Sequence, residues 1–321
     1  MLTVLLSTRN GAGTLPGVLN AFANLQSPPG GWQLVIVDNG STDRTNEIVA
    51  SFEKRLPVRL LHETHPGKNA ALNTGLTSIE GDLVVLTDDD VFPRADWLTR
   101  LRAAADAHPE CSVFGGKILP RWEMPPAAWM ISEVPAGPTF TLTDAALPDG
   151  PTGAHNVFGP NMAVRASVFE SGARFDVSIG PRGSSYPMGS ETEFVRRLLQ
   201  QGHRAWYVAE AVVEHFIRKS QMNVSWILQR AVRYGRGQYR LARAARPVHD
   251  RQWRGVPRYL YRQKMSQYWL ALKAACLFER DALFRARWNL KFINGEIIEA
   301  RLVHGEAAGA PAATASREFQ R

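Results

Sequence analysis

Three consecutive carboxylates directly after an apolar run are the feature that most constrains this 321-residue chain. Residues 83–86 read Leu-Val-Val-Leu, a pattern typical of a buried β-strand. Asp88, Asp89 and Asp90 follow, and two unit charges about 4 Å apart repel by roughly 4 kcal/mol at an effective dielectric near 20. Because side chains alternate along a strand, we expect Asp88 and Asp90 to form a two-carboxylate claw. Hard oxygen ligands of this kind suit Mg²⁺ or Mn²⁺, which share their coordination sphere with substrate phosphates.

A structural role is the alternative for these acidic residues. Aspartates also end strands and cap helices, and Asp90 is placed to cap a helix entered through Pro93 and carrying Trp97. The rest of the chain decides between the two interpretations.

Short apolar runs alternate with helical patterns through the first third of the chain. Buried strands are predicted at residues 2–7, 34–37, 58–61, 83–86 and 112–118, with helices following Pro16, following residues 41–43 and covering 69–76. This alternation predicts an α/β fold with a doubly wound, mostly parallel sheet, in which ligands bind at the carboxyl ends of the strands. Further along, the pattern predicts strands at 158–164 and 204–214 and a helix at 191–201.

Charge and cysteine content narrow the class of protein. The net charge is +8, and from Ile217 onward Lys and Arg outnumber Asp and Glu roughly three to one, which implies an acidic partner. Cys111 and Cys276 lie far apart and have no metal or redox spacing, so we expect reduced thiols and a cytoplasmic protein. The first residues lack a basic leader and a cleavage site, so we do not expect a signal peptide. The apolar stretch 268–278 is broken by Lys273 and is too short to span a membrane.

A set of short motifs in a fixed order carries a resemblance to a known family. They are Leu6-Ser7-Thr8-Arg9-Asn10, residues 35–43 (Val-Ile-Val-Asp-Asn-Gly-Ser-Thr-Asp), residues 67–75 (Gly-Lys-Asn-Ala-Ala-Leu-Asn-Thr-Gly) and residues 88–90. These resemble the nucleotide-binding half of family 2 glycosyltransferases with the GT-A fold. Residues 159–165, 191–194 and 213–215 resemble the acceptor half. A dinucleotide-binding fingerprint fails, because its third glycine would fall at Pro16.

The resemblance implies a division of the chain. Residues 1–216 would form the GT-A catalytic domain, with a nucleotide-sugar half at 1–118 and an acceptor half at 119–216. Residues 217–305 would be a basic, amphipathic helical region, and residues 306–321, rich in Ala and other small residues, a flexible tail.

The resemblance also implies roles for individual residues on the donor side. Thr8 and Asp38 would hold the base and ribose of a nucleotide sugar, although Asp38 is also typical of an Asx turn. Asn39 stands where the family more often has a second Asp, which bears on nucleotide selectivity. Other donor-binding residues implied are Arg9, Asn10, Lys68, Asn73, Asp88 and Asp89. Asp90 would ligate the metal, with His215 as a further ligand or phosphate contact; a buried core histidine is the alternative for His215.

Glu191 is the general base that the resemblance implies, in the motif that opens a helix. It would deprotonate the acceptor hydroxyl for a single in-line displacement with inversion. Glu193 is the second choice, and both residues also suit the first turn of a helix for electrostatic reasons alone. Acceptor-side contacts are predicted at Asn161, Trp122 and His155, and packing is the alternative for the tryptophan.

The basic helical region has two interpretations. Aromatic residues interleave with arginines such as Arg230, Arg243 and Arg262, a pattern that suits adsorption to an anionic membrane. The alternative is an appendage packed on the catalytic domain. Processive synthases of the family carry a Gln and an Arg-Trp pair on such a helix; here Gln229 and Arg233-Tyr234 are one residue too far apart, which favours transfer of one sugar per encounter.

The sequence therefore predicts a metal-dependent, inverting glycosyltransferase that uses Mg²⁺ or Mn²⁺ and a nucleotide diphosphate sugar, with a UDP-sugar favoured. Its acceptor would be a hydroxyl of a saccharide or lipid-linked molecule, in cell-surface polysaccharide or glycolipid synthesis at the inner face of the cell membrane. Two alternatives stay open: a sugar-phosphate nucleotidyltransferase, and a non-catalytic basic module that binds nucleic acid or membrane. The first needs a basic Gly-rich loop, and residues 8–11 supply one Arg. Nucleic acid is the less favoured partner.

Overall fold

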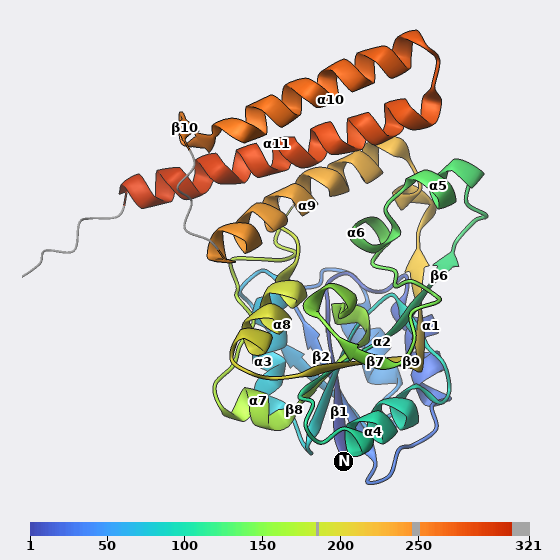
Figure 1. Cartoon of the computed structure of the whole chain (residues 1–321). Helices are drawn as coiled ribbons and strands as arrows, with labels where there is room; N and C mark the ends of the chain where they lie inside the picture. Colours follow the sequence, from blue (N-terminus) through green and yellow to red (C-terminus); the bar gives the residue numbers. More distant parts are fainter. Residues whose placement is uncertain (184–185, 246–250, 310–321) are drawn as a thin grey trace, which may run out of the picture.

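A twisted sheet occupies the centre of the molecule (Figure 1). The computed structural model of the chain describes residues 1–183, 186–245 and 251–309. In sheet order the strands are β3 (Val58–His62), β2 (Trp32–Asp38), β1 (Leu2–Thr8), β4 (Leu83–Asp88), β8 (Met162–Arg165), β6 (Val113–Trp122), β9 (Ala205–Ile217) and β5 (Val91–Pro93), with β7 (Gly150–Thr152) paired to β9. The first four are mutually parallel, and β6 is parallel to β9. β8, β5 and β7 are antiparallel to their neighbours, so the sheet is mixed.

Helices cover both faces of the sheet because successive residues of its strands point to opposite sides. On β1, Leu2, Val4 and Leu6 pack in one core with α1 (Leu15–Ala23), α2 (Thr45–Ser51) and α4 (Trp97–Ala107). Leu5 points the other way, into a core shared with α3 (Lys68–Gly75), α7 (Ala166–Glu170) and α8 (Ser190–Gln200). All the β1 residues from Leu2 to Leu6 are buried, as the continuous apolar run predicts.

Strand register brings the polar strand ends to one edge. Thr8 at the end of β1 pairs with Asp38 at the end of β2, and Ser7 pairs with Asp88 at the end of β4. On the far side of the sheet, antiparallel pairing of Val91 in β5 with His215 in β9 brings His215 beside Asp90. Asp90 precedes β5 and caps no helix; α4 begins at Trp97 with Asp96 at its N-cap.

The irregular middle of the chain contributes two short helices, α5 (Ala128–Glu133) and α6 (Ala136–Phe140), which the sequence pattern did not predict. The strand predicted at 158–164 is shorter than expected. Gly159–Asn161 form a 3₁₀ turn, in keeping with the missing N–H of Pro160, and β8 covers only Met162–Arg165.

Three helices at the end of the chain form a layer above the sheet domain (Figure 1). They are α9 (Val224–Ala245), α10 (Arg258–Cys276) and α11 (Arg280–Gly309), with a small β10–β11 hairpin (Gln252–Trp253, Val256–Pro257) before α10. Ile227 of α9 and Trp288 of α11 belong to the same core as α1 and α4, so these two helices are packed on the sheet domain. α11 continues four residues into the segment predicted as a tail, and residues 310–321 lie outside the described residues.

In the described part of the chain, no helix combines the length and the apolar character that crossing a membrane requires.

Candidate active site

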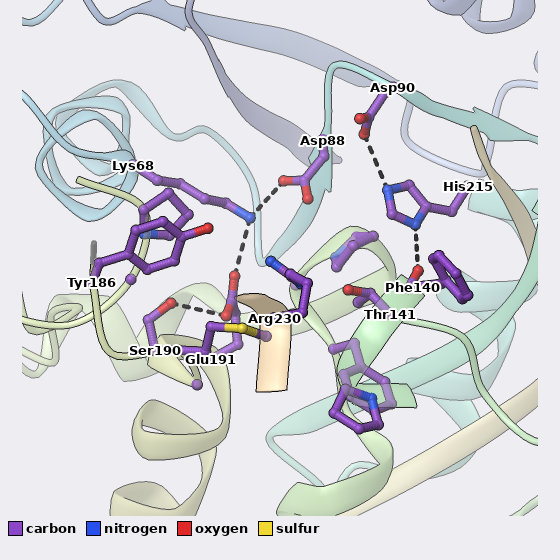
Figure 2. A pocket seen from close by; sticks show the side chains of 18 of the residues that line it. Lys68, Asp88, Asp90, Phe140, Thr141, Tyr186, Ser190, Glu191, His215 and Arg230 are labelled. Carbon is purple, nitrogen blue, oxygen red and sulfur yellow. Dashed lines mark hydrogen bonds and ion pairs between the residues drawn. The ribbon is translucent and has the colours of Figure 1, made fainter. Parts of the chain in front are cut away.

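A cavity of about 530 Å³ opens at the carboxyl edge of the parallel strands (Figure 2). Thr8 and Arg9 from β1 and its following loop line one side. Other elements close it: the start of α3, the start of α8, the end of β9, α6 and one face of α9. The sequence-predicted residues that line the cavity are Thr8, Arg9, Lys68, Asp88, Asp89, Asp90, Glu191 and His215.

Lys68 lies between two carboxylates. Its Nζ is 2.6 Å from Oδ1 of Asp88 and 3.0 Å from Oε1 of Glu191, as the dashed lines in Figure 2 mark. The backbone aims it there: Gly67, the residue before α3, has a φ of 134°, which favours glycine, and its N–H donates to Oδ1 of Asn39 at 2.7 Å. The departure from the family at Asn39 thus has a structural consequence, since this amide also donates to the carbonyls of Glu63 and His65.

Charge pairing sets the protonation of this group. Burial alone would lower the pKa of Lys68, but Asp88 and Glu191 raise it well above its usual range. Burial alone would raise the pKa of Glu191, and the Lys68 ammonium outweighs it and holds that pKa below its ordinary value. Ser190 adds a hydrogen bond of 2.8 Å from its Oγ to Oε2 of Glu191. Glu191 is therefore ionised and oriented at the cavity wall.

The neighbouring carboxylates differ from Glu191. Burial, followed by the charge of Asp90, raises the pKa of Asp89 to about 7, although Thr8 donates a hydrogen bond of 2.5 Å to it. Burial also raises the pKa of Asp88, against the attraction of Lys68 and together with the charge of Asp90. A cation placed beside these groups would relieve their repulsion.

Asp90 and His215 lie next to each other on the opposite side of the cavity from Lys68 (Figure 2). Oδ1 of Asp90 is 3.4 Å from Nε2 of His215, and Oδ2 accepts from Nη1 of Arg218 at 3.1 Å. Burial would raise the pKa of Asp90, but His215 and Arg218 together lower it. Burial opposes protonation of His215, yet the hydrogen bond and charge of Asp90 raise its pKa.

The arrangement of Asp90 and His215 fits a divalent ion. Nδ1 of His215 lies 2.6 Å from the carbonyl oxygen of Phe140, so Nδ1 carries a proton and Nε2 is the nitrogen aimed at Asp90. A metal-bound histidine commonly donates its second N–H to a carbonyl in this way. Adjacent ligands of an octahedral ion lie about 3 Å apart, close to the observed separation. Among residues 1–183, 186–245 and 251–309, no group of three or more His, Cys, Asp or Glu is arranged to hold a metal ion.

Three residues predicted on the donor side do not line the cavity. Asn10 accepts from the N–H of Thr42 at 2.8 Å, and Asn73 exchanges hydrogen bonds with the backbone of Phe175. The buried Asp38 accepts from the N–H of Ser41, three residues further along the chain, at 3.0 Å. These contacts support the loops around the cavity, and donor binding by the three residues stays a prediction.

The predicted acceptor-side residues also lie outside the cavity lining. Asn161 is fully buried and joins three elements: it accepts from Nε1 of Trp97 at 2.9 Å and donates to the carbonyls of Lys117 and Ala211, where the β6–β9 register shifts. Glu193 pairs with Arg197 one turn along α8, at 3.0 Å. Trp122 packs edge-on against Phe140, in the packing role given as its alternative, and His155 is exposed in a 3₁₀ turn.

The cavity contains residues that sequence reasoning did not assign to it. α9 presents Trp226, Arg230, Tyr234 and Gln238, spaced four apart on one face. Nε of Arg230 donates to the carbonyl of Thr139 in α6 at 3.2 Å, and burial lowers the pKa of this guanidinium. The fourfold spacing was the available signal, but it does not tell which face of a helix meets the cavity.

Comparison with known proteins identifies the family. The model of the family described as glycosyl transferase family 2 matches residues 3–172, more than half of the chain. The chain belongs to glycosyl transferase family 2. This match confirms the family inferred from the ordered motifs. A PGL/p-HBAD biosynthesis glycosyltransferase of Mycobacterium bovis is 35% identical over 123 residues, which are 37% of this chain and 47% of that protein. The chain thus spans about half the length of this relative.

Solved structures of similar shape confirm the GT-A fold of this chain, which also carries the C-terminal helices described above. The mannosyltransferase PcManGT from Pyrobaculum calidifontis, in complex with GDP-Man and Mn²⁺, matches 96% of this chain and 76% of its own, with a TM-score of 0.55 and 20% identity. S. aureus TarS 1-349, in complex with UDP-GlcNAc, matches 95% of this chain and 91% of its own, with a TM-score of 0.51 and 15% identity.

Proposed function

We propose that this family 2 glycosyltransferase moves a sugar from a nucleotide diphosphate sugar, with a UDP-sugar favoured, to an acceptor hydroxyl in a metal-dependent, inverting reaction. The observation that carries the proposal is the pair of clusters that face one cavity, Lys68–Asp88–Glu191 on one side and Asp90–His215 on the other. The complexes of two similar folds with GDP-Man and Mn²⁺ and with UDP-GlcNAc support this class of donor.

The donor would lie along the edge formed by β1 and β4. Thr8 and Arg9, which line the cavity, would contact the base and ribose, and Asp88 and Asp89 would contact the ribose and sugar. Lys68 is the cation nearest to this group and would contact the diphosphate, because an ammonium is a strong point-charge partner for phosphate oxygens. The remaining predicted donor-side residues would support the loops around the cavity without touching the donor: Asn10, Asp38 and Asn73.

Asp90 and His215 would hold Mg²⁺ or Mn²⁺. When bound there, the ion neutralises charge that develops on the diphosphate as the bond to the anomeric carbon breaks. Arg218, 3.1 Å from Asp90, offsets part of the negative charge of Asp90 and orients its second carboxylate oxygen.

Glu191 would take the proton from the acceptor hydroxyl. A carboxylate with a depressed pKa is a weak base, and Lys68 is the cause of that depression in the free protein. Diphosphate oxygens compete for the Lys68 ammonium, so donor binding would raise the basicity of Glu191. Glu191 would thus become an effective base only once the donor is in place.

The acceptor would enter over α6 and α9. Trp226 and Tyr234 offer aromatic faces of the kind that pack on sugar rings, and the half-buried Arg230 suits an anionic or hydroxyl-rich group. Four residues stay predicted on the acceptor side, where they would support the cavity from outside its lining: Glu193, Asn161, Trp122 and His155. A saccharide or a lipid-linked acceptor fits this wall, and the enzyme would work in the cytoplasm, at the inner face of the cell membrane. The proposed division into residues 1–216, 217–305 and 306–321 is kept, with α9 shared between catalytic domain and helical region.

Thermal shift with a set of nucleotide sugars, with and without Mn²⁺, followed by release of UDP or GDP, tests the proposal. We expect one donor to stabilise the protein only when Mn²⁺ is present and to be hydrolysed slowly without an acceptor. Stabilisation by nucleoside triphosphate and sugar phosphate instead would favour the nucleotidyltransferase. Salt-dependent binding of RNA or DNA without nucleotide-sugar affinity would favour the non-catalytic module.

A further inference from the structure

The outer side of α10 is apolar and exposed. Met265, Trp269, Leu272 and Cys276 recur at helical spacing and so share one side of the helix. Met265, Trp269 and Leu272 are 56%, 67% and 55% exposed, although such side chains are usually buried in a soluble domain. The opposite side is packed: Leu260 is buried in a core with Ile293 and Ile297 of α11. α10 is also the outermost helix of the C-terminal layer (Figure 1).

The turn after α10 extends this surface. Phe278 links α10 to α11 with a φ of 57°, a conformation that bulky residues rarely adopt, and its side chain is 89% exposed. Leu277 beside it is also exposed. A strained turn that holds an aromatic ring in solvent is costly unless the ring has a partner.

Positive charge accompanies the apolar residues. Arg258 and Arg262 precede Met265 by seven and three positions, and Lys273 follows Trp269 by four, so all three lie on the same side of α10 and are exposed. Between Arg251 and Phe278 the sequence has six Lys or Arg and no Asp or Glu. Long basic side chains of this kind extend to lipid phosphates while their neighbours enter the acyl boundary.

We infer that this surface, the outer side of α10 from Arg258 to Cys276 with Leu277 and Phe278, docks the enzyme on an anionic lipid membrane. Burying aromatic and aliphatic side chains in the interface and pairing Lys and Arg with anionic headgroups both favour this occupant. A second copy of the chain suits the surface less well, because a two-fold contact would place the same cations against each other. The inference narrows the membrane-binding part of the predicted basic region 217–305 to α10 and the turn after it, because α9 and α11 both contribute residues to the core of the sheet domain.

Helices α11 and α9 connect α10 to the cavity. α11 packs against both α10 and α9, and α9 lines the cavity (Figure 1). Docking through α10 would hold the cavity at a fixed height above the lipid, which suits a lipid-linked acceptor. That last step rests on the proposed function, whereas membrane binding itself does not.

Co-sedimentation of the full chain with vesicles, without substrate, tests the inference. We expect binding to phosphatidylcholine mixed with phosphatidylglycerol, weaker binding to phosphatidylcholine alone, and weakening by salt. Trp269→Ser with Leu272→Ser should lower the partition coefficient about tenfold or more. The matched control is Ile298→Ser with Leu302→Ser, two exposed apolar residues of α11 outside this surface, which should bind as the unmodified chain does.

A charge variant separates electrostatic from apolar attraction. Arg262→Gln with Lys273→Gln should weaken binding to the anionic vesicles, whereas Lys54→Gln with Arg59→Gln, exposed on the sheet domain, should not. Cys276 is exposed and Cys111 is buried, so an environment-sensitive dye can be attached to the α10 surface selectively. Its emission should shift to the blue when anionic vesicles are added.

Three outcomes would overturn the inference: no preference for anionic vesicles, unchanged binding by the Trp269/Leu272 variant, or a dimer in analytical ultracentrifugation that this variant converts to a monomer. The last would assign the surface to a second copy. Each result is independent of transferase activity, so failure of docking leaves the proposed reaction standing.

Discussion

Lys68 Nζ lies 3.0 Å from Oε1 of Glu191, although the two residues are 123 positions apart. The contact joins the first turn of α3 to the first turn of α8 across the cavity. It ties the residue proposed to hold the diphosphate to the residue proposed to act as base.

Replacement of Lys68 by Gln should move the pH dependence of turnover. With Lys68 present, the pKa of Glu191 is depressed, so the base stays ionised at pH values below its ordinary 4.5. Without the ammonium, burial dominates and raises that pKa, so a larger fraction of Glu191 is protonated at a given acidic pH. The acidic limb of the kcat/KM profile, which reports the free enzyme, should move to higher pH. An unmoved limb would show that Lys68 does not set the ionisation of the base.

Replacement of Asp90 by Asn should remove the metal dependence of nucleotide binding. The amide is a poorer ligand for Mg²⁺ or Mn²⁺, so UDP affinity in the presence of Mn²⁺ should fall on the order of tenfold or more. Calorimetric titration with UDP, with and without Mn²⁺, measures it. Asp281→Asn on the exposed start of α11 is the matched control. Equal Mn²⁺ enhancement in the Asp90 variant would assign the ion elsewhere.

Gly159 makes room for the proposed base. A Cβ atom at this position would lie 2.5 Å from Oε1 of Glu191 and 2.8 Å from its Cγ, so Gly159→Ala must displace the carboxylate. We expect kcat to fall about 10²-fold, with donor affinity little changed, because a shift of about 1 Å in a reacting group has an effect of that size. Gly13→Ala is the control, since a Cβ there meets no atom within 4 Å. Loss of donor affinity with unchanged kcat would contradict this account.

Glu299 of α11 is a buried link to α9. It is fully buried and accepts from Nε of Arg236 at 2.7 Å and from Arg240. Glu299→Ala leaves buried guanidinium charge without this carboxylate and should lower the free energy of unfolding by about 3–5 kcal/mol. Urea denaturation measures the change, with Glu279→Ala, an exposed residue, as control. A loss under about 1 kcal/mol would place it in the range of ordinary surface substitutions.

Most strands and helices in the first half of the fold could be predicted from the sequence. The mainly apolar runs at residues 2–7, 34–37 and 83–86 mark β1, β2 and β4, and polar residues at their ends converge because parallel strands end at one edge. That is why Thr8 and Asp88, at the ends of β1 and β4, both line the cavity.

Long-range pairings were out of reach of the sequence pattern. His215 meets Asp90 only because β5, a strand of three residues, pairs antiparallel with β9. Asn161 was assigned to the acceptor side from its motif. Its side-chain amide instead donates to the carbonyl of Ala211, at the point where the register between β6 and β9 shifts. Arg230 sits on a helix that periodicity predicts, yet which face meets the cavity depends on packing of α9 against α11.

The central claim is that Glu191 takes the proton of the acceptor hydroxyl, and the most direct test is the turnover of Glu191→Gln with the donor that the nucleotide-sugar screen identifies. The amide keeps the size and polarity of the side chain but cannot accept the proton. The account predicts a fall in kcat of ~10²–10⁴ with the affinity for UDP and Mn²⁺ retained. Turnover within about twofold of the unmodified enzyme would contradict it and would move the base to another residue.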